Sequence, residues 1–536
     1  YNIGIGRTAL YCNTTGEHNT ALGFNALRHN TTGQHNIAAG YSALFSNTTG
    51  QFNIALGCGS MYYANSGGNN NAFGYQALNK NWNGSGNQAI GREALACTTT
   101  GSCNDAMGYR ALYKNTTGGS NVAIGAFAMS DAAGGDYNVA VGKYAANKNE
   151  STRNTAIGYY SLYANTANDN TAVGYGAAAQ NTTGYYNTAV GKGALEDNQT
   201  GVHNTALGYC ALHENEANNN TGVGMYAMLC NTSGTTNVAV GNYTLQNNTT
   251  VDGNTVVGYA AGYANTTGGC NTAVGRWALC SNTTGCRNAV LGADAMCLNT
   301  TGDFNTSIGY QSMFDNLSGY QNVALGYAAL ADNTKGHNNT AIGESALRKN
   351  IEANANTAVG KSANACNTTG EYNASLGYLA LNNNTTAGYS TAIGACALFC
   401  NTTGTGNLAI GFCSLFANVT ANNNVAVGDE AIRNNTTGAS NVALGAHALL
   451  INTEGRHNQA MGTETLKCNT CGGCNIGIGT EALRSNSTGG NNIGIGHVAM
   501  YCNTIGERNI AIGISSLYSN TSAHDNVGMG FRALCK

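Results

Sequence analysis

The chain has 536 residues, 74 of them glycine and none proline, and only 9% of them are charged, against about a quarter in an ordinary globular domain. Proline lacks a backbone donor, so these proportions disfavour a mixed α/β enzyme and favour a chain with hydrogen-bonded neighbours almost everywhere. The formal net charge of −3 gives no electrostatic basis for binding nucleic acid or an anionic membrane. We expect no membrane insertion, because no segment approaches about 20 consecutive apolar residues, and no signal segment opens the chain.

A motif of Asn-x-Ala-aliphatic-Gly recurs from Asn2 to Asn526, with a step of 17 residues almost everywhere. The average copy reads N-T-A-(I/L/V)-G-Y-x-A-L-x-x-N-T-T-G-x-x, and we number the positions of each coil from its first Asn. There are 32 starts, the last cut short at Lys536, and so about 31 tandem coils. Helical repeats and propeller blades are longer, and collagen needs Gly at every third residue. The period therefore predicts an all-β fold, a parallel β-solenoid forming one continuous domain over residues 1–536.

The first predicted element of each coil is a short strand that ends at position 5, which is Gly in all 32 copies. An invariant Gly implies either a positive φ or a backbone approach too close for a Cβ, at Gly23, Gly125 and Gly275 for example. Position 3 is almost always Ala, Gly or Ser, and position 4 is apolar throughout, on the opposite side of the pleat. We expect both faces of this strand to be buried. If one face fills the coil, further chains are the natural cover for the other.

A second short strand is predicted at positions 8 and 9, where a small residue precedes a larger apolar one, as in Ala26 and Leu27. Coils this small cannot bury a core alone, so neighbours must stack at about 4.8 Å, and the stack would form a rod on the order of 150 Å long. Three coils are one residue shorter after position 12, which predicts a surface loop there; they begin at Asn138, Asn154 and Asn204.

Position 1 is Asn in every copy except Ser390, and position 12 is Asn in all but three complete coils. In-register stacking predicts two amide ladders, the first containing Asn19 and Asn271 and the second Asn30 and Asn282. Asn-Thr-Thr is also an N-glycosylation sequon. We favour the ladders, because a stacked Asn side chain is not accessible and Asn-Thr-Thr-Gly is strong turn chemistry.

Cysteine occurs 19 times. Three candidate disulfide pairs straddle the loop: Cys97/Cys103, Cys280/Cys286 and Cys468/Cys474. Two further pairs occupy one position in successive coils, where stacking would bring their Cα atoms within disulfide reach: Cys396/Cys413 and Cys280/Cys297. Cys280 can serve only one partner, and cysteine as a small apolar filler is the alternative. Some disulfides would indicate an extracellular or virion setting.

The 10 histidines and 26 acidic residues are scattered over variable coil positions, with no triad, phosphate loop or dinucleotide fingerprint. We therefore expect no enzyme activity, no cofactor and no metal site. His18 and His35 at position 17 would stack, but exposed loop histidines are the better interpretation there. Zinc at Cys471 and Cys474 would need a second pair of ligands.

Position 6 is often Tyr, as at Tyr41, Tyr75, Tyr209 and Tyr327. Exposed aromatic side chains could contact glycans or partner surfaces, and a solvated flank with ordinary stacking between coils is the alternative. Aromatic residues in successive coils would favour binding, whereas the scatter that the sequence mostly shows favours a passive shaft. Ice binding is a remote alternative, because the Thr pairs lie mostly in the loop.

The segments Asn121 to Gly125 and Asn237 to Gly241 read Asn-Val-Ala-(Ile/Val)-Gly. There the chain resembles the head repeats of trimeric autotransporter adhesins, whose units form a left-handed parallel β-roll trimer. The longer Asn-Thr-Ala-Ile-Gly-Tyr…Asn-Thr-Thr-Gly form is similar to repeats of phage tail-fibre and bacterial surface-fibre proteins. The resemblance covers essentially the whole chain and implies left-handed winding and a homotrimer. The longer coil and the lack of a heptad stalk and anchor depart from the adhesins.

The first and last coils are ordinary repeats, so we expect no caps and a rod that continues or stacks end to end. We predict a structural protein, the stiff shaft of a fibre or filament on an extracellular, cell or virion surface. It would associate with itself as a homotrimer or an end-to-end filament. The alternative is an adhesin whose variable positions 6 and 7 and loop recognise cell-surface glycans.

Overall fold

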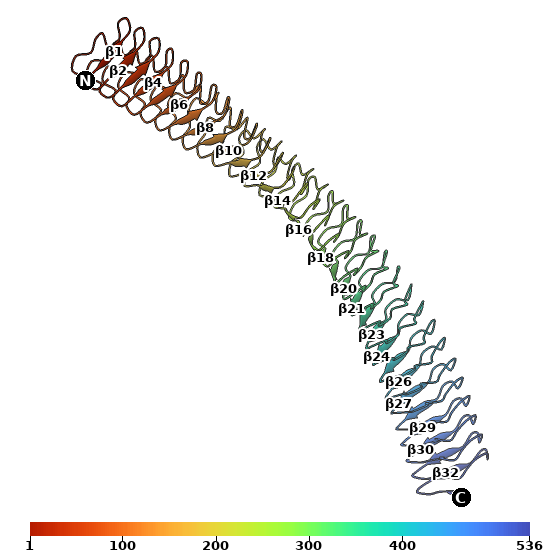
Figure 1. Ribbon diagram of the computed structural model, residues 1–536. Coiled ribbons are helices and arrows are strands. Elements are labelled where there is room, and N and C mark those ends of the chain that lie inside the picture. Colours follow the sequence, from red (N-terminus) through yellow and green to blue (C-terminus); the bar gives the residue numbers. More distant parts are fainter. The chain divides into compact units, whose positions relative to one another are not determined.

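The computed structural model describes all 536 residues, and strands are its only regular elements. The chain divides into two compact units, residues 1–267 and 268–536. Each unit is a parallel β-solenoid with one three-residue strand per coil (Figure 1). The predicted fold class, an all-β parallel solenoid with a 17-residue coil, is confirmed. The left-handed winding and the continuity of the two units as one domain stay predictions.

Each strand pairs in parallel with the strand of the next coil, position for position, as in the match of Thr155 to Thr171. The strands of the first unit are β1 (Ile3–Ile5), β2 (Thr20–Leu22), β3 (Ile37–Ala39), β4 (Ile54–Leu56), β5 (Asn71–Phe73), β6 (Gln88–Ile90), β7 (Asp105–Met107), β8 (Val122–Ile124), β9 (Val139–Val141), β10 (Thr155–Ile157), β11 (Thr171–Val173), β12 (Thr188–Val190), β13 (Thr205–Leu207), β14 (Thr221–Val223), β15 (Val238–Val240) and β16 (Thr255–Val257). Those of the second unit are β17 (Thr272–Val274), β18 (Ala289–Leu291), β19 (Thr306–Ile308), β20 (Val323–Leu325), β21 (Thr340–Ile342), β22 (Thr357–Val359), β23 (Ala374–Leu376), β24 (Thr391–Ile393), β25 (Leu408–Ile410), β26 (Val425–Val427), β27 (Val442–Leu444), β28 (Gln459–Met461), β29 (Ile476–Ile478), β30 (Ile493–Ile495), β31 (Ile510–Ile512) and β32 (Val527–Met529).

The glycine at position 5 ends each strand, and both physical reasons for a glycine apply there. Gly23 has a φ of 134°, and a Cβ added to it would lie 2.5 Å from the carbonyl oxygen of Gly40 in the next coil. Gly125 and Gly275 have φ values of 133° and 142° and meet the next coil in the same way. Since L side chains rarely adopt this φ and there is no room for one, only glycine fits.

The second predicted strand, at positions 8 and 9, is wrong: positions 6 to 11 form a turn segment. Asn25 and Leu27 hold left-handed φ values of 59° and 49°, and Ala26 and Leu27 are both fully buried. In a strand, successive side chains point to opposite faces, so two adjacent buried residues require this different backbone. The turn segments still stack, because the Leu27 N–H donates to the Ala43 carbonyl of the next coil at 3.0 Å.

The core is thin, with the position 3 alanines of the strands on one side and positions 8 and 9 of the turn segment on the other. Ala21 is fully buried, whereas its neighbour Leu22 at position 4 is 50% exposed. Within a single chain the strand is therefore buried on one face and exposed on the other, and burial of the second face by further chains stays a prediction. The face with the small residues of position 3 fills the coil, because the strand packs directly on the turn segment and leaves room for little more than a methyl group. The larger apolar residues of position 4 point outward.

In most coils two asparagine side chains fill the remaining corner and form amide ladders, which are interrupted at position 12 by Ala64, Thr98 and Ala132 and at position 1 by Ser390. The Asn36 Nδ2 group donates to Oδ1 of Asn19 in the preceding coil at 3.1 Å and to the Gly50 carbonyl at 2.9 Å. Asn47 at position 12 donates to Oδ1 of Asn30 at 2.8 Å and to the same Gly50 carbonyl at 3.1 Å. These amides are fully buried. The Nδ2 atoms of the sequon asparagines, which N-glycosylation would modify, are therefore held in hydrogen bonds of the ladders within the folded coil.

Asn271 and Asn282 hold the same places in the second unit. Both donate from Nδ2 to the Gly285 carbonyl, each at 2.9 Å. The next coil in turn donates to their Oδ1 atoms, from the backbone N–H of Asn288 at 2.9 Å and from Asn299 Nδ2 at 2.7 Å. The same corner is therefore built in both units.

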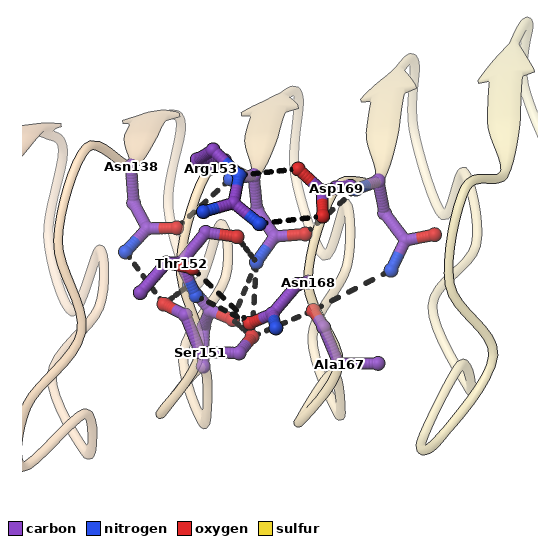
Figure 2. A network of polar contacts seen from close by, with 10 residues as sticks. Asn138, Ser151, Thr152, Arg153, Ala167, Asn168 and Asp169 are labelled. Atoms are coloured by element: carbon purple, nitrogen blue, oxygen red, sulfur yellow. Dashed lines mark hydrogen bonds and ion pairs between the residues drawn. The ribbon is translucent and has the colours of Figure 1, made fainter.

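The shortened coils keep the ladder intact. In the coil that begins at Asn138, the Asn138 Nδ2 group donates to the Ser151 carbonyl at 2.8 Å, and this carbonyl replaces the usual glycine (Figure 2). The Asn154 N–H then donates to Oδ1 of Asn138 at 2.9 Å. On the exposed side of this loop, the Arg153 guanidinium donates two hydrogen bonds to the Asp169 carboxylate, at 2.6 and 2.8 Å (Figure 2). The missing residue is absorbed in the loop after position 12, as the sequence predicts.

Candidate functional site

The outward face of the strands, made of positions 2 and 4, is an almost uncharged surface in each unit. Every position 4 residue is apolar, and Asp105 is the only charged residue at position 2. Exposed position 4 side chains in the first unit are Ile5, Leu22, Ile90, Met107, Ile124, Ile157 and Leu207, and in the second Leu291, Leu325, Leu376, Ile393, Leu444, Ile478, Ile512 and Met529. We call this surface the aliphatic face.

Threonines also lie on the aliphatic face, at position 2. Strands β10 to β14 carry Thr155, Thr171, Thr188, Thr205 and Thr221 in register. Sequence reasoning considered only the Thr pairs of the loop and missed this array. The array ends at Val139 in β9 and at Val238 in β15, and β5 to β7 carry Asn71, Gln88 and Asp105 at the same position. A regular threonine array of the kind expected for ice binding is therefore confined to a few coils.

Positions 6 and 7 carry a second surface, which we call the ring ladder, in the first unit. The contacts run through consecutive coils with ring or cation-to-ring distances from 5.1 to 6.4 Å. Its members are Tyr75, Arg92, Tyr109, Phe127, Tyr144, Tyr159, Tyr175, Lys192, Tyr209, Tyr226, Tyr243 and Tyr259. One side chain from every coil between β5 and β16 takes part, so the contact is unbroken over these coils.

A charged cluster joins successive coils in the second unit. Glu464 accepts from Lys467 Nζ at 2.7 Å and from Arg484 Nε of the next coil at 2.7 Å. These hydrogen bonds, from Lys467 first and Arg484 second, hold the pKa of the Glu464 carboxyl below its ordinary value. His447 of the preceding coil lies 3.9 Å from Glu464 and 3.7 Å from Glu430. The cluster therefore acts as an electrostatic link across several coils.

The structure brings together the two cysteine pairs that share a coil position. The thiols of Cys396 and Cys413 interact with each other, and so do those of Cys280 and Cys297. Burial, with a smaller contribution from Cys396, raises the pKa of the Cys413 thiol. Because the Cys280 thiol interacts with that of Cys297, Cys297 competes with Cys286 to be the disulfide partner of Cys280.

The other pairs lie on either side of the loop and flank the amide-filled corner; they are Cys97/Cys103, Cys280/Cys286 and Cys468/Cys474, and Cys280 is buried. Cys103 and Cys474 are exposed, and Cys97, Cys286 and Cys468 are half-buried. The structure contains no disulfide bond, and all the pairings stay predictions.

The histidines at position 17 take part in ring stacking. His18 stacks on Tyr1 at 5.2 Å and on His35 at 4.8 Å, and His35 stacks on Phe52 at 4.9 Å. No group of three or more His, Cys, Asp or Glu side chains is placed to hold a metal ion.

Neither the family models nor the curated proteins match this chain. The structure also contains no helix with the length and apolar character of a membrane span.

Sequence reasoning missed the ring ladder because its members alternate between two coil positions. Tyr109 and Tyr159 occupy position 6, whereas Phe127 and Tyr144 occupy position 7. At either position alone, the aromatic residues look scattered. Counting aromatic and cationic residues over both positions, coil by coil, is the signal that would have found the pattern.

Proposed function

We propose that this chain forms the stiff shaft of an extracellular or virion fibre, with a mechanical function. The main support is the bonding of each coil to the next by the strand ladder, the turn-segment hydrogen bonds and the two buried amide ladders. Each coil contacts only its neighbours, which is typical of an extended repeat protein. Such an arrangement resists bending and leaves few unbonded backbone groups for a protease.

The aliphatic face supports the further proposal that copies of the chain associate through it. Monomeric soluble proteins rarely expose a contiguous apolar patch larger than a few hundred Å². Sixteen strands of three residues would present about 800 Å² per unit, close to the roughly 800 Å² that each partner buries in a standard interface. A second copy has the same coil spacing, so the two faces can match over many coils. The resemblance to adhesin and tail-fibre repeats favours three copies.

Mass per unit length, measured by scanning transmission electron microscopy of the native particle, tests this proposal. One 17-residue coil per step of about 4.8 Å predicts about 0.36 kDa/Å for a single chain and about 1.1 kDa/Å for three. We expect the higher value. A value near 0.36 kDa/Å would contradict association through the aliphatic face. A compact particle without a constant mass per length would contradict the shaft itself.

A second candidate function, recognition of surface glycans, is favoured by the ring ladder. Aromatic side chains in successive coils are the pattern expected of a binding surface. Tyrosine presents an apolar ring and a hydroxyl group, which suits the mixed surface of a sugar. Binding of the native particle to immobilised glycans, compared with a Tyr159→Ala/Tyr175→Ala variant, tests this candidate. Unchanged binding by the variant would rule out the ring ladder as the binding surface.

A further inference from the structure

A gap in the aromatic contacts lies just before the ring ladder begins. Phe24 and Tyr41, at position 6 of two successive coils, stack with ring centroids 5.2 Å apart. The next coil has Cys58 at this position, and the coil after it has Tyr75. The face of Tyr41 that points away from Phe24 therefore meets no ring. Tyr41 and Tyr75 are 58% and 46% exposed.

A glycine enlarges this gap. Gly59 follows Cys58 at position 7 and has a φ of 66°. The backbone does not require glycine there, because Ser42 and Gln76 hold a φ of 52° at the same position of the adjacent coils. A Cβ on Gly59 would also meet nothing closer than 3.4 Å. The missing side chain thus leaves space that other coils fill.

The result is a cavity of about 260 Å³, which we call the ring gap. Its main lining residues are Tyr41, Tyr62, Tyr63, Tyr75, Gln76 and Asn79. Asn79 donates from Nδ2 to the Gly59 carbonyl at 2.8 Å, which holds the floor in place and leaves its Oδ1 as an acceptor. No charged side chain lines the cavity, so a neutral ligand fits it best.

The coil spacing determines what thickness of ligand fits. Two steps of about 4.8 Å place the rings of Tyr41 and Tyr75 about 10 Å apart. A ring midway between them would lie about 5 Å from each, within the 4.5 to 7 Å range of stacked rings. The ring gap therefore has room for one six-membered ring between two tyrosines.

We propose that the ring gap binds one neutral pyranose ring of a glycan. The C–H faces of the sugar would pack on Tyr41 and Tyr75, and its equatorial hydroxyl groups would bond to Gln76, Asn79 and the tyrosine hydroxyls. A flat aromatic ligand would leave these polar groups without partners, which is unfavourable when they are shielded from water. The proposal does not depend on the shaft function, and it deepens the glycan-binding candidate by naming a site and a ligand class.

Saturation-transfer NMR on the full chain tests it, with the methyl glycosides of glucose, galactose, mannose and N-acetylglucosamine as probes and indole as the aromatic comparator. Cys58→Tyr supplies the absent ring with the residue common at this position, and we expect it to weaken binding at least tenfold. Ala446→Tyr, the same addition at position 6 of a distant coil, is the matched control and should bind as the native chain does. Circular dichroism checks that both variants fold.

A second measurement keeps the test independent of that variant. Cys58 is exposed in the ring gap, so a bound glycoside should slow its alkylation, measured by peptide mass spectrometry, without slowing that of exposed Cys471. No transfer to any glycoside, or transfer unchanged by Cys58→Tyr, would overturn the proposal. So would binding of indole alone. Glycoside binding lost in the Tyr159→Ala/Tyr175→Ala variant but kept in Cys58→Tyr would overturn the ring gap while supporting the glycan candidate.

Discussion

At the residue scale, this fold depends on backbone conformations that most proteins use sparingly. Positions 7, 9 and 17 of nearly every coil are left-handed, as at Asn25, Leu27 and His35. Such a conformation costs a non-glycine residue roughly 1–2 kcal/mol, and the hydrogen bonds between coils offset this cost. Position 5 accepts only glycine, because the backbone of the next coil also occupies the space that a side chain would need.

Two glycines of one coil separate these effects. Gly174 at position 5 has a φ of 140°, and an added Cβ would lie 2.5 Å from the Gly191 carbonyl oxygen. Gly176 at position 7 has a φ of 65° and 3.4 Å of clearance to Glu196. We expect Gly174→Ala to destabilise the coil by more than ~3 kcal/mol and Gly176→Ala by about 1 kcal/mol. Urea unfolding and hydrogen exchange measure both, and equal losses would contradict the steric explanation.

Asn364 is a buried polar residue in the wrong environment. It occupies position 9, where most coils have Leu, and neither side-chain atom of its amide has a hydrogen-bond partner. We expect Asn364→Leu to raise the free energy of unfolding by ~1–3 kcal/mol, the cost of an unsatisfied buried polar group. Asn367 in the same coil is the control, because it bonds to Asn350 and Gly370. Asn367→Leu should destabilise, and a stabilising effect there would refute the ladder argument.

At the element scale, side chains reinforce the contact between coils, and the Glu464 cluster should do so in a pH-dependent way. Its lowered pKa means that the folded state favours the carboxylate. The stabilisation is therefore present above the ordinary carboxyl pKa of about 4.5 and is lost as the pH falls through the lower folded value.

Glu464→Gln tests this link. We expect the variant to be less stable than the native chain at pH 7, with a difference that shrinks as the pH falls below the ordinary carboxyl pKa of about 4.5, measured by hydrogen exchange of the amides in β28 and β29. Glu481, one coil further on, forms no ion pair and serves as the control through Glu481→Gln. A stability difference for Glu464→Gln that stays the same as the pH is lowered would show that the side chain acts through packing instead.

The stacked cysteines offer a second link between coils. We expect mild oxidation to join Cys396 and Cys413, with a rate that rises with pH, because burial raises the pKa of the Cys413 thiol and the thiolate is the reactive form. Peptide mass spectrometry would identify the bond, and Cys413→Ser should abolish it. If Cys396 remains reduced under these conditions while other cysteines pair, the stacked geometry does not direct oxidation.

Much of each coil could be predicted from the sequence because its residues repeat. The invariant glycine, the two asparagines and the loop deletions each have physical causes that the repeat itself indicates, and in-register stacking follows from them. The turn segment could not be predicted in the same way. Ala26 and Leu27 fit a short strand by composition, and only the left-handed φ of Leu27 turns both side chains inward. Leu22 points outward because Ala21, its neighbour in the strand, points into the core and successive strand side chains alternate.

At the scale of the whole molecule, the aliphatic face and the ring ladder lie on different segments of the coil. Positions 2 and 4 belong to the strand, whereas positions 6 and 7 belong to the turn segment that follows it. Association through the strands would therefore leave the turn segments accessible. A fibre of this design could join copies through one surface and contact glycans through the other, so the two proposed functions are compatible.

The amide ladders also give each unit an electrical direction. Many ladder asparagines donate from Nδ2 toward the preceding coil, as Asn36 does to Asn19 and Asn47 to Asn30, so these side-chain dipoles add along the stack. Backbone N–H groups of the strand region point both ways along the stack, from Thr20 to Asn36 of the next coil and from Gly23 to Ile5 of the preceding one, whereas aligned side-chain amides sum as peptide units do in an α-helix. Copies packed in the same direction would form a fibre with a permanent dipole, and copies packed in opposite directions would cancel it. Orientation of the particles in an electric field would therefore report whether neighbouring chains run parallel.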